Sequence, residues 1–170
     1  MKQALADALV KRGYETLTPV QSAVLAPELI QADLLVSAQT GSGKTVGFGL
    51  AIADSLLGSL EEFGRATRPL ALVIAPTREL ALQVKRELQW LYAEARATLA
   101  SCVGGMDMRD ERRSLERGTH IVVATPGRLR DHIGRGSIDL SQLRAVILDE
   151  ADEMLAVSYT HLTLPTKRIV

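Results

Sequence analysis

The chain has 170 residues, enough for one domain with its own hydrophobic core, and 46% of them are hydrophobic. Its 20 basic residues balance its 20 acidic ones, so any surface for nucleic acid has to be a local patch. The lone Cys102 excludes an internal disulfide, argues against a metal cluster, and is interpreted as a small buried hydrophobe in a reducing, cytoplasmic protein. No apolar run approaches the ~20 residues of a membrane span, and Asp7 interrupts the only apolar start that could resemble a signal peptide.

The first third of the chain predicts two helices, a short strand and a glycine-rich turn. Residues 2–12 predict a helix that Gly13 ends, and Thr18 before Pro19 predicts the capped start of a second helix with an apolar face up to Ile30. An apolar run at 34–36 predicts a strand, and residues 46–57 predict a helix. The intervening AQTGSGKT (38–45) has the layout of a phosphate-binding loop, in which backbone N–H groups surround an anion. Taken alone, this stretch could also be a chance glycine-rich turn.

The rest of the chain alternates short apolar runs with amphipathic segments. Strands are predicted at 70–75, 99–103, 121–124 and 145–148, and helices from about 80 to 95, at 107–117 and from about 126 to 133. This alternation predicts an α/β fold with a mostly parallel sheet and helices on both faces. In such folds the chemistry lies at the carboxyl ends of the strands. The candidate motifs fall at those ends or at helix starts: residues 38–45, 76–80, 104–105, 125–128 and 149–152.

Acidic residues follow the last predicted strand, where they could serve a metal and a water molecule. Asp149 could hold Mg²⁺ through water beside the Thr45 hydroxyl, and Glu150 could orient or deprotonate an attacking water. A helix cap with an acidic first turn is the alternative for this pair. The other strand ends offer donors for a polyanion and no group suited to reading bases. A surface ion pair is the alternative for each arginine alone, and the mixed-sign run 109–113 is interpreted as a solvated helix face.

Together these motifs resemble the first RecA-like domain of a DEAD-box ATP-dependent RNA helicase. They stand in the family's order over residues 2 to about 155. They are GYETLTPVQ (13–21), AQTGSGKT (38–45), PTREL (76–80), GG (104–105), TPGR (125–128) and DEAD (149–152).

This resemblance implies a RecA-like P-loop NTPase fold over residues 1–156 and RNA-stimulated ATP hydrolysis coupled to local duplex unwinding. It implies ATP and Mg²⁺ as cofactors, adenine recognition by Gln21, and catalytic roles for Lys44, Asp149 and Glu150, with Thr45 and Asp149 serving the metal. Asp152 is expected to couple nucleotide state to a second RecA-like domain. The expected ATP contacts are Tyr14, Thr18, Gln21, Thr40, Gly41, Ser42, Gly43, Lys44 and Thr45. The expected contacts to the RNA sugar-phosphate backbone, independent of base sequence, are Thr77, Arg78, Gly104, Gly105, Thr125 and Arg128.

The sequence departs from the family pattern in several places. Leu17 stands where the family usually has proline, and the aromatic residue that stacks on adenine is expected upstream of the chain. The chain ends soon after DEAD, so the Ser-Ala-Thr motif and the second domain with its arginine fingers are expected to be absent, and this half alone is expected to be nearly inactive. Residues 157–170 resemble a translated sequencing adapter and are interpreted as a non-native tail. Two alternative functions are another P-loop nucleic-acid motor and a non-catalytic nucleotide- or RNA-binding module.

Overall fold

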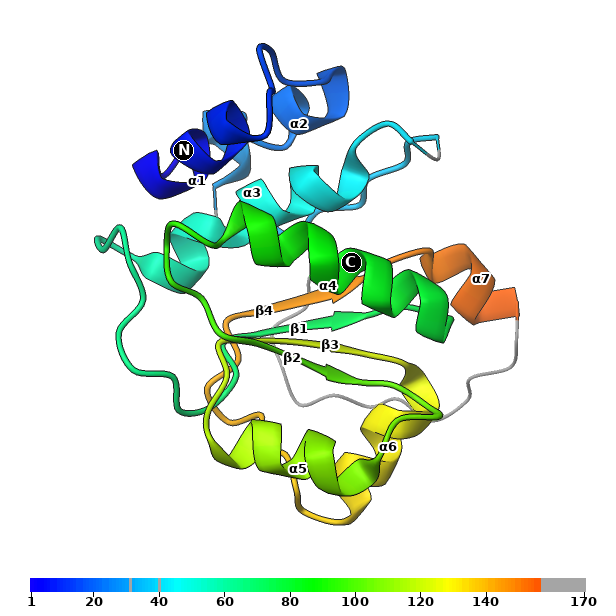
Figure 1. Ribbon diagram of the computed structural model, residues 1–170. Helices are drawn as coiled ribbons and strands as arrows, with labels where there is room; N and C mark the ends of the chain where they lie inside the picture. The colour runs from blue at the N-terminus through cyan, green and yellow to red at the C-terminus, as the bar shows by residue number, and fades with distance from the viewer. Residues whose placement is uncertain (31, 40, 157–170) are drawn as a thin grey trace.

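The computed structural model describes residues 1–30, 32–39 and 41–156 (Figure 1). Thr40 and the expected tail at 157–170 lie outside the described residues. The elements in order are α1 (Gln3–Lys11), α2 (Pro19–Ala23), the 3₁₀ turn η1 (Pro27–Leu29), α3 (Lys44–Leu57), β1 (Ala71–Ile74), α4 (Arg78–Leu91), β2 (Leu99–Cys102), α5 (Met108–Glu116), β3 (Ile121–Ala124), α6 (Pro126–Gly134), β4 (Ala145–Leu148) and α7 (Ala151–Ala156).

The four strands of the described residues form one parallel sheet in the order β2-β3-β1-β4. In register, Ile74 lies opposite both Ala124 and Leu148, and Cys102 lies opposite Ala124. All four strands therefore end at the same edge. Strands β1 and β3 are buried along their whole length, as expected for apolar runs covered on both faces. The predicted parallel sheet is confirmed.

Helices cover both faces of the sheet, and each face has its own core. In Figure 1, α1, α3 and α4 lie on one side of the sheet, and α5 and α6 lie on the other. Strand residues alternate between the two cores, so that Ala71 and Val73 pack with the first set of helices while Leu72 and Ile74 face the second. None of the helices within the described ranges is long and apolar enough to cross a membrane.

Three sequence expectations about elements are wrong. Residues 34–36 form no strand: Leu35 is 83% exposed, and three apolar residues flanked by polar ones bury too little surface to offset the cost of ordering the backbone. The second helix does not continue to Ile30, because Pro27 has no N–H with which to extend it, and the chain forms the short turn η1 instead. Helix α4 ends at Leu91, four residues before the expected end near Ala95.

Candidate functional site

The carboxyl edge of the sheet carries every candidate motif that follows a strand. Because the strands are parallel and in register, the segments that leave them begin side by side. The segments contribute Thr77 and Arg78 after β1, Gly104 and Gly105 after β2, Thr125 and Arg128 after β3, and Asp149 and Glu150 after β4.

The glycine-rich loop before α3 has the backbone conformation of an anion cradle. Gly41 and Gly43 have φ of +81° and +84°, in the left-handed region that glycine adopts without strain. Gly43 is the residue just before α3, and Lys44 begins the helix. A left-handed residue at a helix start turns successive N–H groups toward one point, where the positive end of the helix dipole adds to their pull.

Thr18 and Gln21 form a reciprocal cap at the start of α2, and the same two side chains hold the glycine-rich loop in place. The Gln21 N–H donates to Thr18 Oγ1 at 3.4 Å, and the Thr18 N–H donates to Gln21 Oε1 at 3.0 Å. The same side chains reach the loop, since Thr18 Oγ1 donates to the Ser42 carbonyl at 2.9 Å and Gln21 Nε2 donates to the Gly43 carbonyl at 3.3 Å. Gln21 is fully buried, and its amide keeps one N–H and one acceptor lone pair beyond these bonds.

Two further groups make the loop fit a phosphate. Ser42 Oγ is buried and has no hydrogen-bond partner among the described residues, so it is free to donate to a phosphate oxygen. Lys44 Nζ lies 3.3 Å from Glu150 Oε1, and both side chains remain about a quarter exposed. This ion pair joins the loop to the end of β4 across 106 residues of sequence.

The carboxylates after β4 fit a divalent cation by their donor chemistry. Asp149 is buried, and this burial, together with the adjacent Glu150, raises the pKa of its carboxyl, while Lys44 acts in the opposite direction. Glu150 has a left-handed φ of 52°, which is strained for a residue with a side chain. Two neighbouring carboxylates and the Thr45 hydroxyl at the first turn of α3 are hard oxygen donors of the kind that Mg²⁺ prefers.

The contacts of the other residues expected to bind nucleotide or to couple the domains do not test those roles. The Tyr14 ring stacks on Trp90 of α4 with centroids 5.8 Å apart, and both rings pack against the core. Asp152 is exposed on α7. The expected roles of Tyr14 and Asp152 stay predictions, and so does that of Thr40, which lies outside the described residues.

Near the carboxyl ends of β2 and β3, several neighbours hold the Arg128 side chain in place. Its Nε donates to the Val103 carbonyl at 3.2 Å, its Nη2 donates to the Met106 carbonyl, and Glu111 lies 3.3 Å from Nε. Arg78 packs on the same segment, with Nη2 3.6 Å from Met106 Sδ.

The residues expected to bind RNA therefore adjoin one another. The Arg78 guanidinium lies against the backbone of Gly105, where a Cβ would collide with it. Thr77 caps α4 by accepting from the Leu80 N–H, and Thr125 stands just before α6. Thr77, Arg78, Gly104 and Gly105 are all exposed.

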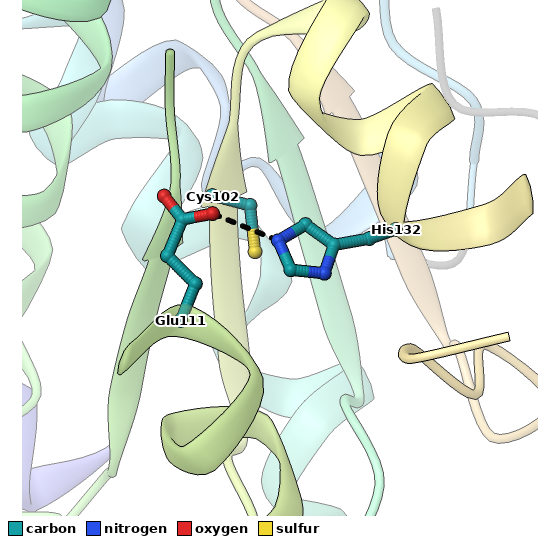
Figure 2. Close-up of side chains that lie close together, drawn as sticks. All are labelled: Cys102, Glu111 and His132. Atoms are coloured by element: carbon teal, nitrogen blue, oxygen red, sulfur yellow. Dashed lines mark hydrogen bonds and ion pairs between the residues drawn. The ribbon is translucent and has the colours of Figure 1, made fainter. Parts of the chain in front are cut away.

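Glu111, which pairs with Arg128, belongs to a buried polar cluster with His132 and Cys102 (Figure 2). His132 Nε2 lies 2.8 Å from Glu111 Oε2, its Nδ1 lies 2.7 Å from Ser137 Oγ, and Glu111 Oε1 accepts from the Val103 N–H at 2.8 Å. The sulfur of Cys102 also faces this group, and the ligand atoms of Cys102, Glu111 and His132 lie within 4.8 Å of one another.

The cluster has the composition of a metal site but the bonding of a hydrogen-bond network. Both ring nitrogens of His132 are engaged with protein groups, and burial, followed by the nearby Glu111, raises the pKa of the Cys102 thiol to about 12, so the thiol keeps its proton at neutral pH. Sequence reasoning missed this cluster because its members come from β2, α5 and α6. Helical spacing gave one signal, since it places Glu111 and Leu115 on the same face of α5.

Comparison with known proteins identifies one helicase family over nearly the whole chain. The family model described as DEAD/DEAH box helicase matches residues 18–164. The chain is 42% identical over 156 residues to "DEAD-box ATP-dependent RNA helicase 53" of Oryza sativa subsp. japonica, with 91% of this chain and 25% of that protein covered. It is 38% identical over 159 residues to "DEAD-box ATP-dependent RNA helicase CshA" of Geobacillus kaustophilus, with 94% of this chain and 33% of that protein covered.

Solved structures agree with the sequence relatives. A hypothetical ATP-dependent RNA helicase from Sulfolobus tokodaii superposes with a TM-score of 0.79 at 34% identity, covering 94% of this chain and 44% of that one. The yeast DEAD-box splicing factor Prp28 superposes with a TM-score of 0.82 at 30% identity, covering 94% of this chain and 39% of that one. The chain spans a quarter to a third of the length of the two curated relatives named above.

Proposed function

This chain belongs to the DEAD/DEAH box helicase family, and from that premise we propose that it is the ATP-binding half of an ATP-dependent RNA helicase. The observation that carries the proposal is the Lys44–Glu150 ion pair, because it brings the phosphate loop and the DEAD segment to one place. Neither motif alone excludes a structural role, but a phosphate cradle beside paired carboxylates suits the hydrolysis of a nucleoside triphosphate.

ATP binding is assigned to the loop and to the residues that support it. The phosphates lie against residues 41–45, where Ser42 Oγ and the N–H groups donate and Lys44 neutralises charge. The adenine edge takes the remaining N–H and lone pair of the Gln21 amide, which favours ATP over other nucleotides. Lys44 pairs with Glu150 in the structure, so a phosphate that attracts the Lys44 ammonium would weaken this pair and leave the Glu150 carboxylate available to orient or deprotonate a water.

Thr45 and Asp149 are the residues proposed to serve Mg²⁺, Asp149 through water. When bound, the ion would neutralise charge that develops on the phosphate oxygens. The raised pKa of Asp149 fits this role, because a buried carboxyl beside a second carboxylate is stabilised as the anion when a cation binds.

RNA binding is assigned to the sugar-phosphate backbone, without readout of bases. The exposed donors are Arg78, Thr77 and the backbone at Gly104 and Gly105, and Arg128 and Thr125 stand beside them. Asp152, exposed on α7, is proposed to face a second RecA-like domain, which the complete helicase requires for hydrolysis. We further propose a reducing, cytoplasmic setting, because the lone cysteine is buried and unpaired.

The test is nucleotide binding by the chain, followed by turnover in a full-length protein that includes both domains. The Lys44→Ala variant should bind a fluorescent ATP analogue at least ~10-fold more weakly than wild type, while Lys11→Ala, which removes an exposed lysine paired with Glu94, should bind normally. In the full-length protein, Glu150→Gln should bind ATP and RNA but lose RNA-stimulated hydrolysis. Unchanged turnover would instead favour a non-catalytic binding module, and stimulation by DNA in place of RNA would favour another P-loop motor.

A further inference from the structure

Residues of α5 and α6, with Arg135 and Ser137 just after α6, line a wide hollow rich in arginine. These two helices lie on the sheet face opposite α3 and α4 (Figure 1). The volume of the hollow is about 660 Å³, and four arginines line it with one acidic residue, Asp131. The arginines are Arg109, Arg112, Arg128 and Arg135. Since the whole chain has no net charge, this is a local concentration of positive charge.

Helical spacing brings these side chains to one surface. Arg109 and Arg112 are three residues apart on α5, so they share a face of that helix. Arg128, Asp131 and Arg135, at spacings of three and four, share a face from the start of α6 to the residue after its end. The run 109–113 is a solvated face as interpreted from the sequence, except for the buried Glu111, and two of its arginines line the hollow together with Arg128 and Arg135.

Protein contacts leave much of this positive charge without a partner. Arg109 and Arg135 make no ion pair with any of the described residues, and Arg112 has only the exposed Glu116 at 3.2 Å. A smaller hollow of about 170 Å³, near the amino ends of β1 and β3, differs in how its arginines are paired. There Arg68 pairs with Asp139 and Arg144 donates to carbonyls of α3, which leaves Arg65 as the one lining arginine without such a contact among the described residues.

The hollow is continuous with the edge proposed to bind RNA, because Arg128 belongs to both. Its guanidinium donates to the carbonyls of Val103 and Met106, on either side of Gly104 and Gly105, and its side chain also lines the hollow. A strand that lies on the glycine pair therefore has a row of arginines next to it. Arginine forks suit phosphate oxygens, and a shallow array of them suits a polyanion more than a small ligand.

We propose that the hollow between α5 and α6 is a second phosphate-binding site, which holds the backbone of the same RNA strand beyond its contacts at GG and TPGR. This site rests on the proposed function, because it needs RNA on the strand-end edge. Arg109, Arg112 and Arg135 bind phosphates there, and Arg128 joins the two sites.

The experiment measures binding of a fluorescently labelled single-stranded polyuridine RNA to the chain by anisotropy over a range of salt concentrations. The test variant combines Arg109→Gln, Arg112→Gln and Arg135→Gln, and the charge-matched control combines Arg86→Gln, Arg113→Gln and Arg117→Gln. All six arginines are exposed, so both variants should fold, which circular dichroism checks. The test variant should bind ~10-fold or more weakly, and its slope of log K against log salt should be shallower by about 2, as expected for the loss of three phosphate contacts. The control should keep the wild-type slope.

Each other outcome overturns the proposal. If the test variant and the control bind alike while Arg128→Gln weakens binding, the RNA path stops at TPGR and the proposed function stands. If the folded wild-type chain binds no RNA at low salt, the RNA assignment of the proposed function fails as well. If a polyglutamate peptide of equal charge displaces the RNA from wild type, and the test variant loses affinity for both equally, the hollow is a site for acidic peptides.

Discussion

The part of the strand-end edge proposed to bind nucleotide (the nucleotide side) and the part proposed to bind RNA (the RNA side) differ in how their side chains are held. On the nucleotide side, Lys44 and Glu150 form one partly exposed ion pair, Ser42 Oγ has no partner among the described residues, and the segment before the loop forms no strand. On the RNA side, Arg128 and Glu111 are held by several bonds to two helices and a strand end. The difference indicates that the side chains of the RNA side are arranged in advance. On the nucleotide side Thr18 and Gln21 hold the loop backbone, but the Lys44, Glu150 and Ser42 side chains would be arranged by a ligand.

The largest effect should come from breaking the network on the RNA side. Replacing Glu111 by Ala removes the buried anion between Arg128 and His132 and leaves the Val103 N–H without its acceptor. We expect the free energy of unfolding in urea to fall by about 3 kcal/mol. Glu111→Gln keeps an acceptor and should lose less, and Glu116→Gln, at an exposed pair on the same helix, should lose almost nothing. Equal losses in Glu111→Ala and Glu116→Gln would remove the basis for calling this side pre-arranged.

The next effect tests how closely the phosphate loop is fitted. An alanine at Gly43 meets both a left-handed backbone and the Gln21 amide, whereas an alanine at Gly41 meets only the left-handed backbone, with open space around it. We expect Gly43→Ala to lower the free energy of unfolding by about 2 kcal/mol and Gly41→Ala by about 1 kcal/mol. Both should weaken ATP binding. If Gly41→Ala proved the more damaging for stability, contact with Gln21 would not constrain the loop.

A smaller effect should follow from removing the hydrogen bonds by which Thr18 holds the phosphate loop. Thr18→Val removes the cap of α2 and the bond to the Ser42 carbonyl, while Thr16→Val changes an exposed residue nearby. We expect Thr18→Val to cost about 1 kcal/mol of stability and to weaken ATP binding several-fold, and Thr16→Val to change neither. Calorimetric titration with ATP provides the measurement. If Thr18→Val were destabilised but bound ATP as tightly as wild type, the cap of α2 would contribute to stability and not to nucleotide binding.

The smallest effect concerns a region remote from both halves. Burial lowers the pKa of His120, whose Nδ1 accepts from the Thr98 N–H and whose ring stacks on Phe63. The unfolded chain therefore takes up this proton first as the pH falls below the ordinary value of 6.5, and the folded state loses stability until the pH passes the lowered pKa. His120→Asn should flatten this part of the stability profile measured by urea unfolding between pH 7 and 5. Parallel profiles would assign the pH dependence to other groups.

The parts of the site that the sequence predicted are those fixed by local chemistry. A helix start after Gly43 and a carboxylate after the apolar run at 145–148 depend on neighbours in the chain, and the parallel register then aligns the strand ends. The cluster around Glu111 was not predictable in this way, because it depends on contacts between α5, α6 and β2. The failed strand at 34–36 has a different cause: its three apolar residues are too few to bury enough surface, and no other strand pairs with them within the described residues.

The bonds from Thr18 and Gln21 to the loop carbonyls have a consequence for protein engineering. The Gln21 amide assigned to adenine also supports the loop backbone proposed to bind the phosphates. Nucleotide specificity and phosphate binding would therefore depend on the same side chain. An attempt to redesign this protein for another nucleoside triphosphate by replacing Gln21 alone would therefore alter the cradle itself. Such a redesign needs a replacement that still donates to the Gly43 carbonyl, and libraries of variants should be built on that constraint.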